Sequence, residues 1–570
     1  MAQKQQDKFV LYQIFTRLFG NSTLTNNFNG TLEQNGVGKF KDINTAALKS
    51  IKALGVSHIW YTGIIEHATM TDYSAYGIRK DHPLVVKGIA GSPYAIKDYY
   101  DVVPDFAEDV HKRMDEFEAL VARTHKQKLK VIIDFVPNHL AREYFSDAKP
   151  EGVENFGESD TQSQAFLPSN NFYYIPGSTF KVPHDVNPPV SFGETYIENP
   201  AKATGNDVFS AEPSLNDWYE TIKLNYGVDY LNHRSAQFYP IPDTWKKMRD
   251  ILLYWAEKKV DGFRCDMAEM VPAEFWGWVT KEVKKKFPDV IFIAEIYNPN
   301  NYRQYIFQGG FDYLYDKVGL YDSLRRLIEG HGNANDISRV WQQESGDFAN
   351  RMLRFLENHD EHRIASAEFA GDPFKALTAM ALSAFLHDGP IMLYAGQELG
   401  VLPTQEEGFS GNDGRTTIFD YWGLPELAAW NNGGKWNTAG LSASQKKLRK
   451  AYNDILHFAL ANEAVVSGKF FDLQYVNAHG QSLNYNDSKI YSFLRYTEHQ
   501  KILFVFNFDL QSSYACELFI PNLAFDMMGI ASEKPVLRPM QAHEEAIGLK
   551  RDERFDIKIQ PNSWKSFLLS

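Results

Sequence analysis

Short apolar runs alternate with amphipathic stretches through roughly the first four hundred residues, and this alternation restricts the fold more than any other feature. Many of the runs are continuous in Val, Ile, Leu and Phe. Buried parallel strands have this character, because helices cover both faces of their sheet. We count eight runs with helices between them, which predicts an α/β fold of the (β/α)8 type, a TIM barrel. The runs are residues 9–15, 58–61, 129–135, 262–267, 290–296, 311–315, 352–356 and 390–394.

Two regions interrupt the alternation. Residues 140–240 show no helical period and are rich in Asn, Pro, Ser and aromatic residues, which predicts an inserted domain after the third strand. Residues 463–570 contain short alternating β segments without helices between them, which predicts a C-terminal antiparallel β-sandwich domain. The barrel itself is then expected to comprise residues 1–139 and 241–462.

Composition excludes several classes of partner. The 570 residues carry a net charge of −13, which argues against nucleic acid and against an anionic membrane surface. No apolar run is long enough to predict a membrane-spanning helix. The first 15 residues contain no apolar stretch of signal-peptide length, so we expect a cytoplasmic protein, or a periplasmic or secreted one if a leader has been removed. The oligomeric state stays open.

Carboxylates follow three of the predicted strands. Asp266 ends the fourth strand, Glu295 the fifth and Asp360 the seventh. Since the carboxyl ends of barrel strands converge on one pocket, these three side chains are expected to meet there. Mutual repulsion would raise the pKa of at least one of them. One ionised and one protonated carboxyl group is the combination that glycoside cleavage requires.

Four short motifs carry a resemblance to a known family. They are DFVPNH at 134–139, GFRCDMAE at 262–269, FIAE at 292–295 and ENHD at 357–360. In these motifs, their order and the insertion after the third strand, the chain resembles the α-amylase family, glycoside hydrolase family 13. The resemblance covers nearly the whole chain.

The resemblance implies a role for each carboxylate. Asp266 takes the position of the nucleophile, Glu295 that of the general acid/base, and Asp360 that of the residue that binds sugar hydroxyls and stabilises the transition state. Arg264, two residues before Asp266, is expected to point the same way and to keep Asp266 ionised. The apolar run at 291–293 is expected to help keep Glu295 protonated.

Further substrate contacts are implied in the same way. His139 and His359 match the two histidines that hydrogen-bond the sugar at the cleavage point, although each alone would more often be a structural hydrogen-bonding residue. Tyr94 matches the tyrosine that stacks on that sugar, with Pro93 in place of the usual glycine.

One segment departs from the family pattern. Many endo-acting members carry Lys-His three and four residues after the nucleophile, where this chain has Glu269 and Met270. We therefore expect Glu269 to line the pocket beyond the cleavage point. Asn138 matches the calcium-binding asparagine of the family, which implies a structural calcium ion, with capping of a loop as the alternative role. Met270 weakens this assignment, since the family's histidine there supplies a backbone ligand. No organic cofactor is expected.

The expected activity is hydrolysis of α-glucosidic bonds, chiefly α-1,4, in starch, glycogen or malto-oligosaccharides, with retention of configuration. A transglycosylase or isomerase using the same site is the alternative. A metal-dependent hydrolase built on His359 and His362 would leave the strand-end carboxylates unexplained. A non-catalytic sugar-binding member would have lost carboxylates that this chain retains.

Overall fold

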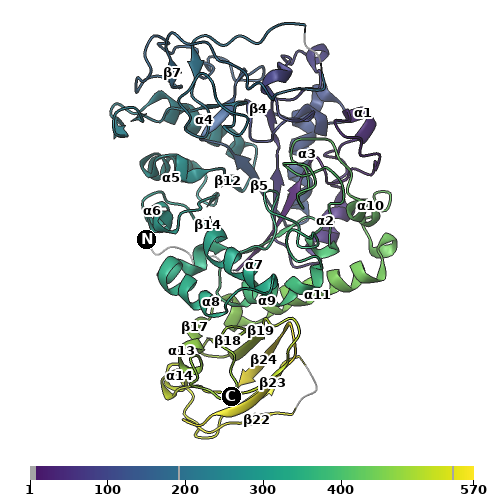
Figure 1. The fold of residues 1–570 in the computed structure, drawn as a ribbon, viewed down its shortest axis with the longest axis vertical. Coiled ribbons are helices and arrows are strands. Elements are labelled where there is room, and N and C mark those ends of the chain that lie inside the picture. Colours follow the sequence, from purple (N-terminus) through teal and green to yellow (C-terminus); the bar gives the residue numbers. More distant parts are fainter. Residues whose placement is uncertain (1–7, 191–192, 542–544) are drawn as a thin grey trace.

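Eight parallel strands form a barrel between the inserted region and the C-terminal sheets (Figure 1). The computed structural model describes residues 8–190, 193–541 and 545–570, and the count refers to these ranges. Hydrogen bonding between β1 and β16, and a parallel bridge from Arg354 to Ile391, close the ring. The predicted (β/α)8 class is confirmed. The strands are β1 (Val10–Phe15), β2 (His58–Thr62), β5 (Lys130–Phe135), β12 (Gly262–Cys265), β13 (Ile291–Ala294), β14 (Tyr313–Tyr315), β15 (Met352–Leu353) and β16 (Ile391–Tyr394).

Side chains on alternate positions of each strand fill the interior of the barrel. Leu11, Trp60 and Ile132 belong to one buried cluster, whereas Tyr12 and Ile133, one position along, belong to the larger cluster outside the strands. This division follows from the period of two in strand side chains. It explains the continuous apolar runs, since both faces of these strands are buried.

Helices follow most of the strands and cover the outside of the barrel. The helix α2 (Thr45–Lys52) begins after Asn44, whose side chain accepts hydrogen bonds from the backbone N–H groups of Ala46 and Ala47. The helix α3 (Arg113–Lys126) begins directly after a 3-10 turn at Val110–Lys112. The other longer helices are α4 (Asp243–Glu257), α5 (Ala273–Lys286), α6 (Pro299–Phe307), α9 (Leu377–Phe385) and α11 (Ala443–Ala461).

The segment between β5 and α4 contains mainly short, antiparallel strand pairs. β6 (His139–Ala141) pairs with β9 (Thr221–Lys223), β7 (Tyr174–Ile175) with β8 (Ala201–Lys202), and β10 (Val228–Asp229) with β11 (Ser235–Ala236). Because β6 begins only four residues after β5, this region lies directly against the carboxyl end of the barrel. The boundaries 140 and 240 themselves stay a prediction.

The C-terminal region is an antiparallel sandwich, at the end of the molecule far from β7 (Figure 1). Leu503 of β19 and Ile557 of β23 share a buried cluster between its two sheets, and Phe504 faces Phe385 of α9 on the barrel side. One sheet has the order β17 (Lys469–Asp472), β18 (Ile490–Tyr496), β19 (Lys501–Asn507), β24 (Ser563–Leu569), β21 (Val536–Pro539) and β22 (Ile547–Gly548), and the other pairs β20 (Tyr514–Leu518) with β23 (Phe555–Ile559).

Three further features concern the cysteines, the helices and the N-terminal residues. Cys265 and Cys516 are free, buried thiols. None of the helices in the described part of the chain has the length and apolar character needed to cross a bilayer. The expectation about a leader rests on the first 15 residues, of which residues 1–7 lie outside the described ranges.

Candidate active site

A cavity of about 820 Å³ lies at the carboxyl ends of the barrel strands. Asp266, Glu295 and Asp360 all line it, so the three carboxylates predicted from the strand ends are brought together. Its volume falls in the range typical of pockets that bind small molecules. Loops from the inserted region, from residues 28–29 and 87–94, and from residues 406–420 contribute to the other walls.

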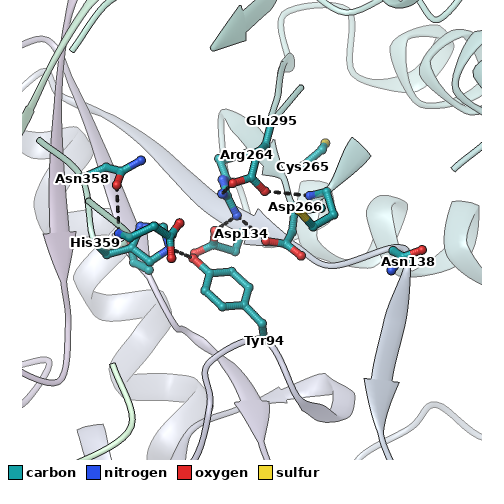
Figure 2. Close-up of polar contacts among 12 residues, drawn as sticks. Tyr94, Asp134, Asn138, Arg264, Cys265, Asp266, Glu295, Asn358 and His359 are labelled. Atoms are coloured by element: carbon teal, nitrogen blue, oxygen red, sulfur yellow. Dashed lines mark hydrogen bonds and ion pairs between the residues drawn. The ribbon is translucent and has the colours of Figure 1, made fainter. Parts of the chain in front are cut away.

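Arg264 is the centre of the charge network beneath the cavity (Figure 2). Its Nη1 lies 2.7 Å from Asp266 Oδ1, and its Nη2 lies 2.7 Å from Glu295 Oε1. Nη1 is also 3.5 Å from Asp134 Oδ1, and Nε donates to the Tyr315 hydroxyl at 3.1 Å. The sequence predicted Asp266 as the ion-pair partner of Arg264. The structure has one buried guanidinium shared by the proposed nucleophile and the proposed acid.

Glu295 is fixed by two further hydrogen bonds. Its Oε2 accepts from the backbone N–H of Met267 at 2.8 Å, and its Oε1 accepts from the Tyr297 hydroxyl at 2.7 Å. Tyr297 also lines the cavity. Sequence analysis missed this tyrosine, although its position two residues after Glu295 was a usable signal, since alternate residues of an extended segment share a face.

Burial raises the pKa of both central carboxyl groups, and Arg264 opposes the rise in each. For Glu295, the negative charge of Asp266 adds to the effect of burial, as the repulsion argument predicted. Asp134 is raised to a pKa of about 7, again mainly by burial. A cluster with more carboxylates than cations therefore favours at least one protonated carboxyl group near neutral pH.

Asp360, His359 and Tyr94 form the opposite side of the site. The Tyr94 hydroxyl hydrogen-bonds His359 Nε2, which lies 3.1 Å from Asp360 Oδ2. Gln13 contacts the other ring nitrogen of His359 at 2.8 Å. Burial and the charge of Arg264 hold the pKa of His359 well below its usual value, so the ring is neutral. Tyr94 and Asp360 line the cavity.

His139 lies on the wall formed by the inserted region. Its ring lies 5.2 Å from that of Trp218, and both side chains line the cavity. Burial chiefly lowers the pKa of His139 to about 4. Trp218 and Glu220 in the same wall were not singled out in the sequence, because nothing in an irregular segment indicates which side chains face inward.

Glu269 does not line the cavity, which corrects the expectation for this residue. Its carboxylate accepts hydrogen bonds from the backbone N–H groups of Tyr297 and Asn298, each at 3.2 Å. The reason lies in the backbone. Met267 adopts a left-handed conformation with φ of 42°, and a 3-10 turn at Ala268–Met270 follows, so the strand does not continue to Glu269.

The surroundings of Asn138 do not suit calcium. Its Oδ1 accepts a hydrogen bond from Lys223 Nζ at 2.6 Å, and its Nδ2 donates to the carbonyl of Gly205 at 2.7 Å. Calcium requires six to eight oxygen ligands, whereas the group that binds the side-chain oxygen here is an ammonium. Asn138 also lies apart from the cluster around Arg264 (Figure 2).

The histidine-based metal site finds no support among the described residues. His359 contacts Tyr94, whereas His362 Nδ1 contacts Arg325 at 2.9 Å. Among those residues, the group of side chains that could hold a metal ion is Glu66, Asp98 and Asp101, on β3 (Ile65–His67) and β4 (Ile96–Val102).

Known proteins resemble the chain in sequence and in fold. A model of the alpha-amylase catalytic domain matches residues 13–425. Alpha-amylase 3 of Dictyoglomus thermophilum is 22% identical, covering 73% of this chain and 74% of that protein. An alpha-1,4-glucan:maltose-1-phosphate maltosyltransferase of Cereibacter sphaeroides is 31% identical over 24% of this chain and 26% of its own length. The alpha-amylase of Geobacillus thermoleovorans, solved in complex with acarbose, superposes with a TM-score of 0.61 at 19% identity, covering 99% of this chain and 98% of that one. Since the match to the catalytic-domain model spans well over half of the sequence, the chain belongs to the α-amylase family of glycosidases, glycoside hydrolase family 13.

Proposed function

We propose that the protein hydrolyses α-glucosidic bonds, chiefly α-1,4, in starch, glycogen or malto-oligosaccharides by a double displacement that retains the α configuration. The observation that carries this proposal is the pair of ion contacts from Arg264 to Asp266 and Glu295, in a cavity that Asp360 also lines. One guanidinium bound to both groups keeps their carboxyl ends close, as direct nucleophilic attack requires.

In the first step an oxygen of Asp266 attacks the anomeric carbon, and the bond from that carbon to the glycosidic oxygen breaks. Glu295 gives its proton to the departing oxygen, and a covalent glycosyl ester remains on Asp266. Burial raises and Arg264 lowers the pKa of both groups, but the hydrogen bond with Glu295 lowers the pKa of Asp266, whereas the charge of Asp266 raises that of Glu295; these two effects support an ionised Asp266 beside a protonated Glu295. Asp360 would stabilise the positive charge that develops on the sugar without bonding to it.

In the second step water attacks the same carbon from the opposite side and displaces Asp266. Glu295, now ionised, accepts the proton that this water loses. Two inversions at one carbon leave the product in the α configuration. The hydrogen bond from Tyr297 and the backbone N–H of Met267 would hold Glu295 in place for both proton transfers.

Transfer to a sugar is the second candidate, because a sugar hydroxyl can attack the same ester in place of water. The similarity of one part of the chain to a maltosyltransferase supports transfer as the second candidate. A digest of maltoheptaose, starch, pullulan, sucrose and trehalose, separated by thin-layer chromatography, distinguishes the two. Hydrolysis predicts only products shorter than maltoheptaose. Products longer than maltoheptaose would favour transfer, and no cleavage of any α-glucan would reject the proposal.

A further inference from the structure

We propose that the ammonium group of Lys223 takes the place of a calcium ion at the junction between the barrel and the inserted region. Lys223 Nζ lies 2.6 Å from Asn138 Oδ1 and 2.6 Å from Asp207 Oδ1. An amide oxygen and a carboxylate oxygen are ligands that calcium prefers. In this chain they bind a cation that is part of the protein, and this inference does not depend on the proposed reaction.

The ammonium joins segments that are distant in the sequence. Asn138 lies in the turn after β5, Asp207 lies in the loop between β8 and β9, and Lys223 is the last residue of β9. Backbone hydrogen bonds support the same junction, since Leu224 N–H donates to the carbonyl of Asn138 at 3.0 Å. Lys223 therefore ties the inserted region to the barrel, as a bound ion would.

Burial and charge favour the lysine over a metal ion. The side chain of Lys223 is 2% exposed and that of Asp207 is 23% exposed, so the ammonium is almost fully removed from water. A buried charge needs a partner of opposite sign, and Asp207 supplies it. The Tyr230 ring, 5.2 Å away, adds a cation–π contact. A divalent ion brought to Asn138 Oδ1 would meet this ammonium and be repelled.

The junction also supports one wall of the cavity. Asn138 Nδ2 lies 3.2 Å from His139 Nδ1, and His139 pairs with Lys223 across β6 and β9. The backbone at Gly205 packs against the same histidine so closely that a Cβ there would lie 2.8 Å from His139 Cβ. Loss of the ammonium should therefore loosen the position of a residue that lines the cavity.

Thermal unfolding of the whole chain tests the proposal without reference to activity. Wild-type protein treated with excess EDTA should have the same Tm as protein supplied with calcium chloride. Lys223→Met, which keeps the length of the side chain and removes its charge, should lower the Tm by several degrees with or without calcium. Lys202→Met is the matched control, since Lys202 lies in the same region but is 3.6 Å from Glu198 and 19% exposed. Its Tm should fall by less.

Two results would overturn the proposal. One is a wild-type Tm that falls in EDTA and is restored by calcium. The other is a Lys223→Met variant as stable as wild type. If Lys223→Met fails to fold, the wild-type comparison between EDTA and calcium decides alone.

Discussion

Two groups of buried carboxylates in the described part of the chain differ in their surroundings, since one opens on the cavity of the candidate site and the other does not. Around Arg264, the carboxyl groups of Asp266 and Glu295 share a single guanidinium and line an open space of about 820 Å³. The second group, which we call the β3–β4 cluster, comprises Glu66, Asp81, Asp98 and Asp101, and none of these residues lines that cavity.

The partners of the β3–β4 cluster differ from those of the active site. Lys97 Nζ lies 3.1 Å from Asp81 Oδ2 and 4.0 Å from Glu66 Oε1, and Arg113 Nε donates to Asp101 at 2.8 Å. Asp98 accepts from the Ser146 hydroxyl and from backbone N–H groups. Lys97 and Arg113 balance two of the four carboxyl groups, and burial raises the pKa of all four, which favours protonation of those left without a cation. A group of buried carboxylates is therefore not by itself an active site. Asp266 and Glu295 differ because they share one cation and face a cavity that a substrate can enter.

The largest effect is expected at Asp266, where a substitution should abolish activity without lowering stability. Asp266→Asn removes the proposed nucleophile and should lower kcat by roughly 10⁴-fold or more, the scale on which loss of such a group acts. The Tm should not fall, because the native site holds a costly buried charge that the amide lacks. Stopped assays on maltoheptaose and thermal unfolding measure both. Asp347→Asn, on an exposed ion pair, is the control. Near-normal turnover in Asp266→Asn would reject the assignment.

The opposite result is expected at Lys97, where a substitution should lower stability and leave turnover unchanged. Lys97→Met leaves Glu66 and Asp81 buried without their cation, and removal of one partner from a buried pair costs about 3–5 kcal/mol of unfolding free energy. Turnover per folded molecule should stay close to wild type, because Lys97 does not line the cavity. Urea unfolding gives the free energy. Lys41→Met, which removes an exposed contact to Glu108, should cost less than about 1 kcal/mol. Equal stability of the two variants would contradict the structural role of Lys97.

Tyr297 is expected to influence proton transfer by Glu295. Its hydroxyl stabilises ionised Glu295 and lowers the pKa of that residue, so Tyr297→Phe should raise this pKa. The alkaline limb of kcat/KM against pH, which reports loss of the acid's proton, should then move to higher pH. The optimum value should fall by roughly 10- to 100-fold, the scale of a hydrogen bond to a charged group. Tyr305→Phe is the control, because the Tyr305 hydroxyl bonds only backbone carbonyls. An unshifted limb would argue against the role of Tyr297.

The smallest effect concerns Glu269. Because its carboxylate holds the backbone of Tyr297 and Asn298, Glu269→Ala should loosen that loop. We expect kcat/KM to fall by roughly threefold to tenfold on both maltoheptaose and an activated aryl α-glucoside, as a small displacement of a catalytic neighbour does. A change in product lengths with an unchanged rate on the aryl glucoside would instead support the original expectation that Glu269 contacts the acceptor sugar.

The fold and the meeting of the three carboxylates could be predicted because they depend on local rules. Continuous apolar runs identified the barrel strands, and the geometry of a barrel brings residues that follow those strands, such as Asp266 and Glu295, to one end. The position of Glu269 could not be predicted, because the left-handed residue at Met267 ends the strand pattern. The contacts of Lys97 and Lys223 join a strand residue to loops that are distant in the sequence, and no sequence period reports which side chains meet across such segments.

The stereochemistry of the first product tests the central claim most directly. Proton NMR of a maltoheptaose digest, recorded before the anomers equilibrate, separates the α and β signals of the newly formed reducing end. A double displacement through Asp266 and Glu295 predicts that the α signal appears first and the β signal grows later by mutarotation. An initial β signal would mean a single displacement by water, and would contradict the assignment of Asp266 as nucleophile.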